Sequence, residues 1–115
     1  MLRGEIRLVD VDPACGNEAD KRRRAVIVSN DRANSIAAQL GRGVVTVVSV
    51  TSNTERIFPF QALLPADSTG LPHDSKAQTE QVRSIAVERI GAILGRAPAD
   101  VMAQLDDALR LHLQL

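Results

Sequence analysis

The run RRAVIVSND at residues 23–31 and the run VVSVTSN at residues 47–53 decide the fold of this chain. Each contains β-branched apolar residues and ends in small polar ones. Such runs are typical of strands that are buried on both faces or nearly so. A guanidinium at the start of one strand and a hydroxyl at the end of the other suit a phosphodiester, because the planar cation matches phosphate oxygens.

Length and charge limit the classes of protein. The 115 residues predict a single domain, residues 1–115, with a modest core. The 14 basic and 14 acidic residues give a formal net charge of 0, which argues against a protein that coats nucleic acid through bulk charge. An anion site would therefore be local. The run KRRR at residues 21–24 is either such a site or a solvated loop, and the two interpretations weigh evenly.

The rare residue types narrow the chemistry further. Cys15 is the single cysteine, and no Cys/His cluster has zinc spacing, so we expect no metal, no cofactor and a reducing cytoplasm. No apolar run approaches the ~18 residues of a membrane span, so we expect no membrane partner. Phe58 and Phe60 are the only aromatic residues, which means that polar contacts must dominate any binding of nucleic acid.

Strand signals outnumber helix signals and are joined by short connections. This favours a small curved α+β sheet, a compact and partly closed barrel, over a βαβ sandwich. Pro59 makes the fourth strand an edge candidate. The expected strands cover residues 4–11, a second beginning at 23, then 44–51, 57–64, a weaker one at 75–85 and a short one at 90–94, with a loop at 65–74.

Two helices are indicated by their ends. Asn30 or Asp31 can cap a short helix over residues 32–40, which Gly41 ends. After Pro98, apolar residues recur at helical spacing and predict an amphipathic helix at the end of the chain.

Motifs spread in order along nearly the whole chain point to one family. They are RGEI at residues 3–6, VDVDP at 9–13, Arg23 with VIVSND at 26–31, VTSN at 50–53, LPA at 64–66, EQVRSI at 80–85 and LDDAL at 105–109. Together they resemble the MazF/PemK toxins of bacterial toxin–antitoxin modules.

The resemblance implies a small SH3-like barrel, of the CcdB/MazF kind, that forms a homodimer. It also implies a sequence-specific, metal-independent endoribonuclease that cleaves single-stranded RNA to 2′,3′-cyclic phosphate and 5′-hydroxyl ends and so inhibits translation and growth. A cognate MazE-like antitoxin would silence it. A guanidinium and a hydroxyl are sufficient for this reaction, because the RNA supplies its own 2′-hydroxyl nucleophile and the protein need only move protons and stabilise charge.

The resemblance places the catalytic arginine at Arg23, which begins the second strand, and the catalytic threonine at Thr51, which ends the third. Because arginine keeps its proton and is a poor general base, stabilisation of the phosphorane is the favoured role for Arg23. Thr51 can donate to a nonbridging oxygen, or it can be an ordinary strand-end residue. Because Arg24 stands where the family usually has proline, Arg22 and Arg24 stay open as alternative registers. Arg7 stands where many relatives carry an aromatic residue.

Substrate contacts implied by the resemblance are polar side chains able to read the base edges of single-stranded RNA. Their alternative roles are caps and turns, which weigh evenly for Asp31 and Asn34. A second function, a noncatalytic module that binds gyrase or titrates antitoxins, also fits the fold. The substrate-binding candidates are Asn17, Glu18, Arg24, Asn30, Asp31, Asn34, Ser52, Asn53, Gln81 and Arg83.

Overall fold

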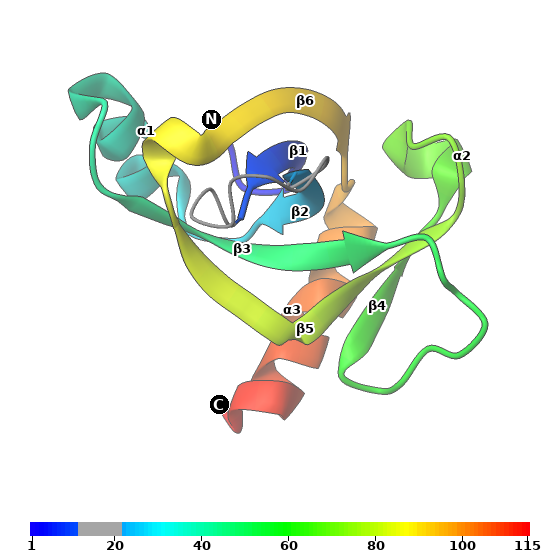
Figure 1. Cartoon of the computed structure of the whole chain (residues 1–115). Coiled ribbons are helices and arrows are strands. Elements are labelled where there is room, and N and C mark those ends of the chain that lie inside the picture. Colours follow the sequence, from blue (N-terminus) through cyan, green and yellow to red (C-terminus); the bar gives the residue numbers. More distant parts are fainter. Residues whose placement is uncertain (12–21) are drawn as a thin grey trace.

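The computed structural model describes residues 1–11 and 22–115 (Figure 1). All strand pairs are antiparallel and form one sheet in the order β4-β5-β3-β2-β1-β6. The sheet curls, but its outer strands do not pair with each other within the described residues, so the predicted α+β class and partly closed barrel are confirmed. The elements are β1 (Glu5–Asp10), β2 (Arg22–Ile27), α1 (Asp31–Leu40), β3 (Val44–Thr51), β4 (Gln61–Leu64), α2 (Ala66–Thr69), β5 (Ser75–Ala86), a 3-10 turn (Val87–Arg89), β6 (Ile90–Arg96) and α3 (Ala99–Leu113).

Apolar side chains fill both sides of the central strands. Successive residues of a strand point to opposite faces, so the continuous apolar runs of β2 and β3 supply both sides at once. This confirms the prediction of strands buried on both faces. One cluster contains Ile6, Val26, Val48, Leu64 and Leu105, the last from α3, and the other contains Val9, Ala25, Ile27, Val45, Val47 and Ala37, the last from α1.

Strand β5 bends sharply beside β3 (Figure 1). The pairing register changes between Val48 and Ser49, so that residues 79–81 of β5 are extra residues without partners on β3. Such an insertion bends a strand and increases its twist. Thr79, fully buried at the bend, donates its hydroxyl to the carbonyl oxygen of Phe60. The sequence predicted only a weaker strand here, because the polar residues needed at the bend interrupt the apolar pattern.

The region before β5 differs from the prediction in two places. The fourth strand covers only Gln61–Leu64 rather than residues 57–64, since the chain makes a turn in which the Gln61 amide donates to the Phe58 carbonyl at 2.9 Å. Its position at the edge of the sheet is as predicted. The expected loop at 65–74 contains the short helix α2, which ends at Gly70.

Arg7 of β1 is part of a buried ion pair. It donates to Glu5 Oε1 at 2.9 and 3.0 Å and to the Gly91 carbonyl oxygen at 2.8 Å, while Arg96 donates to Glu5 Oε2 at 3.3 Å. Glu5 is only 4% exposed. Burial alone raises the pKa of Glu5, but the hydrogen bonds and charge of Arg7, with a backbone hydrogen bond at Leu2, outweigh it and leave this pKa below its ordinary value. The guanidinium thus ties β1 to β6.

Gly95 allows β6 to approach α2 closely. A Cβ at this position would lie 2.4 Å from the Thr69 carbonyl oxygen. We expect Gly95→Ala to lower the free energy of unfolding by about 1–3 kcal/mol, because backbone must move to make room. Urea denaturation measures this, with Ala92→Ser at an exposed position of the same strand expected to change it by less than ~0.5 kcal/mol. Equal midpoints for the two variants would contradict the close approach.

Candidate active site

A cleft of about 310 Å³ lies where β2, β3 and the bend of β5 meet. It contains four residues that the sequence proposed for the site: Arg23, Thr51, Gln81 and Arg83. Ser49 and Gln78 also line it and were not predicted. The sequence could not indicate Gln78, because only the register change in β5 places it opposite Ser49. The lining residues are Val11, Arg23, Ser49, Val50, Thr51, Gln78, Gln81 and Arg83.

The pairing of β2 with β3 sets the positions of Arg23 and Thr51. Ala25 pairs with Ser49, and the same antiparallel register continued by two residues puts Arg23 opposite Thr51, on one face of the sheet. Arg23 is exposed, and its guanidinium makes a long hydrogen bond of 3.4 Å to the Arg22 carbonyl oxygen. Within the described residues it has no carboxylate partner, which leaves N–H donors for a ligand.

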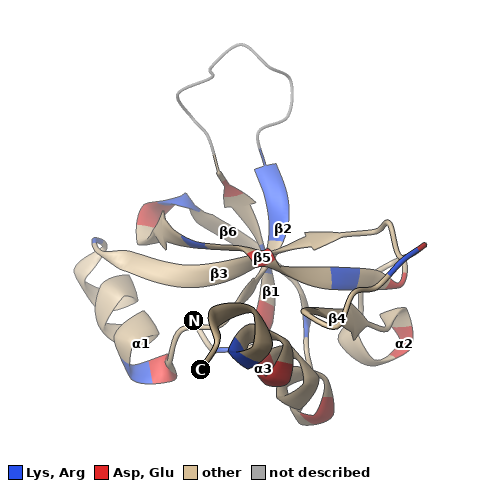
Figure 2. Cartoon of the chain, turned by 90° about the horizontal axis from the view of Figure 1, so that it is seen from below, with Lys and Arg blue, Asp and Glu red and all other residues tan. Residues whose placement is uncertain are grey.

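Strand β2 begins with three arginines, which Figure 2 shows in blue. They differ in the face of the sheet to which their side chains point. Arg22 and Arg24 face the opposite side from Arg23, since neighbouring residues of a strand alternate. Arg24 donates to Ser75 Oγ at 3.3 Å, and Arg22 pairs in register with Asp10. Neither lines the cleft. Of the three registers that the sequence left open, the geometry favours Arg23.

Thr51 is the last residue of β3, and its hydroxyl oxygen already accepts one hydrogen bond. Its Oγ1 accepts a hydrogen bond from the Asn53 amide at 3.2 Å, so the hydroxyl hydrogen stays available within the described structure. Asn53 Oδ1 in turn accepts from the Glu55 amide at 3.2 Å, a side-chain turn that leads the chain away from the strand. Ser52, between them, is exposed. Thr51 therefore has both a turn-forming role and a free donor.

Arg83 adds a second cation to the cleft from β5. Its Nη2 donates to the Val11 carbonyl oxygen at 3.2 Å, which holds the exposed side chain across the sheet towards β1. Gln81, also exposed, comes from the bend. With Arg23 these residues make a polar cleft with two guanidinium groups on its wall, and none of the described residues that line it is acidic. Such a surface suits a phosphodiester and the edges of bases.

Three predicted substrate residues lie at the start of α1 and not in the cleft. Asn30 Oδ1 caps the helix by accepting from the Ala33 amide at 2.8 Å. Asp31 Oδ1 accepts from the backbone amide of Arg3 at 2.6 Å. Asn34 is fully buried, and it accepts from Ser29 Oγ at 2.5 Å and donates to the Ser29 carbonyl oxygen at 2.9 Å. The predicted Asn17 and Glu18 lie outside the described residues.

We expect Asn34→Ala to lower the free energy of unfolding by about 1–3 kcal/mol, because it removes the buried partner of the Ser29 hydroxyl. The cleavage rate of the folded variant should not change. Thermal denaturation and an RNA cleavage assay measure the two effects, with Ser35→Ala, exposed on the same helix, as the matched control. A slower cleavage with unchanged stability would contradict the structural role and place Asn34 at the RNA.

The described residues provide neither a membrane-spanning helix nor a metal-binding cluster. No helix among them is long and apolar enough to cross a membrane. They also contain no group of three or more His, Cys, Asp or Glu side chains placed to hold a metal ion.

The fold is that of solved MazF-type toxins. A structure of MazF from Deinococcus radiodurans superposes with a TM-score of 0.74 at 26% identity, covering 100% of this chain and 97% of that one. An endoribonuclease in complex with its cognate antitoxin, from a mycobacterial species, gives a TM-score of 0.75 at 24% identity, covering 100% of this chain and 96% of that one. These likenesses define the class as a MazF-type fold.

Sequence comparison identifies the family within that class. Residues 2–113 match the family described as PemK-like, MazF-like toxin of type II toxin–antitoxin system. Endoribonuclease MazF9 of Mycobacterium tuberculosis is 61% identical over 115 residues, covering 100% of this chain and 98% of the relative. Endoribonuclease EndoA of Bacillus subtilis is 25% identical over 98% of this chain and 94% of its own. The chain therefore belongs to the PemK-like, MazF-like toxins of type II toxin–antitoxin systems, and it is an endoribonuclease.

Proposed function

We propose that the chain cleaves single-stranded RNA in the cleft, at short recognition sequences and without a metal ion, and that this inhibits translation and growth. The observation that carries the proposal is the placement of Arg23 and Thr51 on one face of adjoining strands in a single cleft. The first presents a guanidinium with free donors, and the second presents a hydroxyl. Both groups suit the anionic phosphorane that forms during RNA cleavage.

The reaction takes its nucleophile from the substrate. The 2′-hydroxyl gives up its proton to water as its oxygen attacks the adjacent phosphorus. The bond from phosphorus to the 5′-oxygen breaks, and this oxygen takes up a proton from water, so the products are a 2′,3′-cyclic phosphate and a 5′-hydroxyl end. Arg23 stabilises the charge that builds on the nonbridging oxygens, because its planar donors match them. Thr51 donates its hydroxyl hydrogen to one of these oxygens. Arginine is a poor general base, so Arg23 acts through charge.

Recognition of bases falls to the polar residues that surround this pair. Gln78 and Gln81 carry amides that both donate and accept, and Arg83 supplies further donors. Amide and guanidinium groups read the exposed edges of unpaired bases, which is the usual source of sequence specificity in RNA binding. Ser52 and Asn53, just beyond Thr51, extend this polar surface outward.

An antitoxin and a second copy of the chain are the proposed protein partners, in the cytoplasm. The family description and the solved complex of a related endoribonuclease with its cognate antitoxin support the first. For the dimer, the sequence offered residues 44–50 or the last helix as the interface. In the first segment Val44 is exposed, but Val45, Val47, Val48 and Val50 are buried inside the protomer. Leu111, Leu113 and Leu115 at the end of the chain are all exposed and favour the last helix.

Mapping of RNA ends tests the proposed reaction. Purified protein is incubated with a long single-stranded RNA in EDTA, and the new ends are identified. We expect cuts at a short recurring sequence with 5′-hydroxyl and 2′,3′-cyclic phosphate ends. Intact RNA in the presence of folded protein would instead favour the noncatalytic module, and 5′-phosphate ends would contradict attack by the 2′-hydroxyl.

A further inference from the structure

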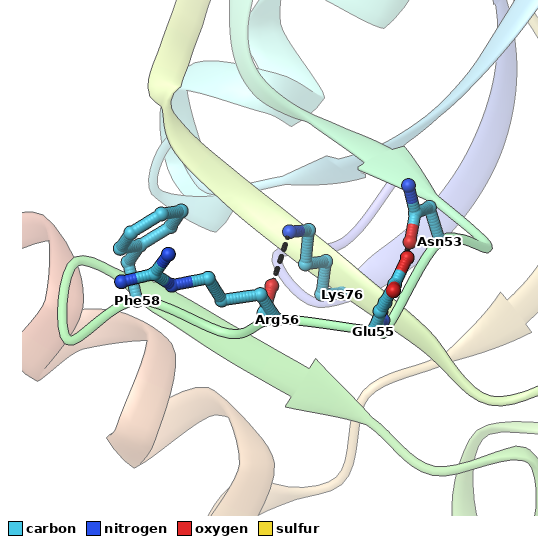
Figure 3. A pocket seen from close by; sticks show the side chains of 5 residues that line it. All are labelled: Asn53, Glu55, Arg56, Phe58 and Lys76. Atoms are coloured by element: carbon cyan, nitrogen blue, oxygen red, sulfur yellow. Dashed lines mark hydrogen bonds between the residues drawn. The ribbon is translucent and has the colours of Figure 1, made fainter.

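A second pocket, of about 450 Å³, adjoins the cleft on the side of β5. The loop between β3 and β4 supplies most of its wall, and β5 supplies Lys76 (Figure 3). Asn53 is the one residue of its lining that the sequence proposed as a substrate contact. Its lining residues are Asn53, Glu55, Arg56, Phe58 and Lys76.

Lys76 is buried in an unusual way for a lysine. It is only 8% exposed, and its ammonium group donates to the Arg56 carbonyl oxygen at 2.6 Å. Within the described part of the chain no carboxylate pairs with it. Burial of a lysine without a counter-charge is costly, and an ammonium group has three donors, of which this contact uses one. An anion in the pocket would satisfy the remaining donors and the charge.

Arg56 brings a second cation to the same pocket in a fixed position. Its guanidinium carbon lies 4.7 Å from the centroid of the Phe58 ring, and that ring stacks on Phe60 with centroids 5.3 Å apart and planes 8° apart. Glu55 contributes one negative charge, but its side chain lies beside Asn53, on the opposite side of Lys76 from Arg56 and Phe58 (Figure 3). The part of the pocket between Lys76 and Phe58 is therefore cationic.

Strand register connects this pocket with the cleft. Thr51 pairs directly with Lys76 across β3 and β5, and the continued register of β2 puts Arg23 on the other side of Thr51. Residues directly opposite each other in an antiparallel sheet share a face, and neighbouring strands are about 5 Å apart. Arg23, Thr51 and Lys76 thus form a row across the sheet. An RNA strand that follows this row from Arg23 past Thr51 comes next to Lys76.

We propose that this pocket binds the phosphate of the nucleotide next to the scissile bond, with Lys76 and Arg56 as its ligands. The proposal rests on the proposed function of the cleft. Phe58 is a positioning residue, since it holds the guanidinium of Arg56 in place. A contact to phosphate adds affinity without reading sequence, so the pocket fixes where the RNA lies while the cleft selects which bases are cut.

The salt dependence of the RNA-binding constant reports how many phosphate groups the protein contacts. A mixed-sequence single-stranded RNA is titrated in EDTA against protein made inactive by Thr51→Ala, with and without Lys76→Gln or Arg56→Gln. Each second substitution should weaken binding roughly tenfold and reduce the slope of log K against log salt by about 0.7, the value for one contact to single-stranded RNA. Arg42→Gln, exposed at the opposite end of β3 from Thr51, is the matched control and should leave the slope unchanged. Because Arg56 is exposed, its variant remains informative if Lys76→Gln does not fold.

A neutral phosphate analogue then locates the contact. A methylphosphonate placed beside the mapped cleavage site should weaken binding to the protein with Lys76 roughly tenfold and should have little effect when Lys76→Gln is present, since the contact is already lost. If the methylphosphonate weakened RNA binding equally with Lys76 and with Lys76→Gln, the phosphate pocket would be overturned. Unchanged RNA binding in both Lys76→Gln and Arg56→Gln would overturn it too. In either case, RNA cleavage by the wild type would still support the proposed function of the cleft. If Lys76→Gln and Arg56→Gln weakened binding of an antitoxin peptide but not of RNA, the pocket would be a protein-binding site, and the proposal would likewise be overturned. If the wild type did not cleave RNA but the two variants still reduced the salt slope of RNA binding, the chemistry proposed for the cleft would be wrong and the pocket would remain an RNA site.

Discussion

Arg23→Ala should lower the rate constant for RNA cleavage by about 10²–10³, the usual effect of removing one preorganised charge or donor at a reacting oxyanion. The variant should fold as the wild type does, because Arg23 is exposed and makes one long hydrogen bond. Single-turnover cleavage of a short RNA measures the rate constant directly and separates chemistry from binding.

Arg24→Ala is the matched control for this prediction. The two arginines are neighbours of equal charge, but Arg24 faces the other side of the sheet and contacts Ser75. We expect its rate constant to stay within about threefold of wild type, since it has no contact with the cleft. A large loss in Arg24→Ala with little effect in Arg23→Ala would show that Arg24, and not Arg23, faces the cleft.

Arg7→Leu should lower the free energy of unfolding by about 3 kcal/mol, the second large effect expected from this structure. The substitution leaves the Glu5 carboxylate buried and without its main counter-charge, with the longer contact from Arg96 and the backbone hydrogen bond at Leu2 remaining. Urea denaturation measures the loss. The double variant Glu5→Leu with Arg7→Leu should recover part of it, because no buried charge is then left unpaired. A single variant as stable as wild type would contradict the buried pair.

The same pair predicts how stability depends on pH. The pKa of Glu5 is lower in the folded than in the unfolded chain, so the unfolded chain binds more protons as the pH falls. The contribution of Glu5 is fully present above the ordinary pKa of 4.5, which the unfolded chain has, and is lost as the pH falls through the lower folded pKa. Glu5→Gln should therefore flatten the stability profile below about pH 5. If the free energy of unfolding of Glu5→Gln fell below pH 5 as steeply as that of the wild type, the lowered pKa of Glu5 would be contradicted.

The sequence could predict those elements whose local pattern agrees with their tertiary role. The apolar runs of β2 and β3, the Asn30 cap of α1 and the apolar spacing of α3 each carry a signal within a few residues. The length of β5 could not be predicted in the same way. Its polar residues at 78–80 have partners far away in the sequence, such as Gln61, which donates to Glu80 at 2.7 Å.

Part of the candidate site was predictable, because some of its residues belong to strands with a clear local pattern in the sequence. Arg23 and Thr51 stand at the ends of strands that the sequence makes visible, so the resemblance could be placed on them. Gln78 enters the cleft only through the register change in β5, which no local pattern encodes. Asn34 illustrates the opposite difficulty, because a polar residue at the start of a helix looks the same in sequence whether it binds RNA or, as here, fills a buried hydrogen-bond network.

A single substitution in the substrate shows whether the RNA supplies the nucleophile. Once the cleavage site is mapped, an RNA with one 2′-deoxynucleotide on the 5′ side of the scissile bond is compared with the all-ribose RNA in EDTA. We expect the deoxy substrate to bind with nearly the same affinity and not to be cut, because it lacks the nucleophile that Arg23 and Thr51 are placed to assist. Cleavage of the deoxy substrate at the mapped bond would contradict attack by the 2′-hydroxyl, since the protein would then have to supply or activate a nucleophile of its own.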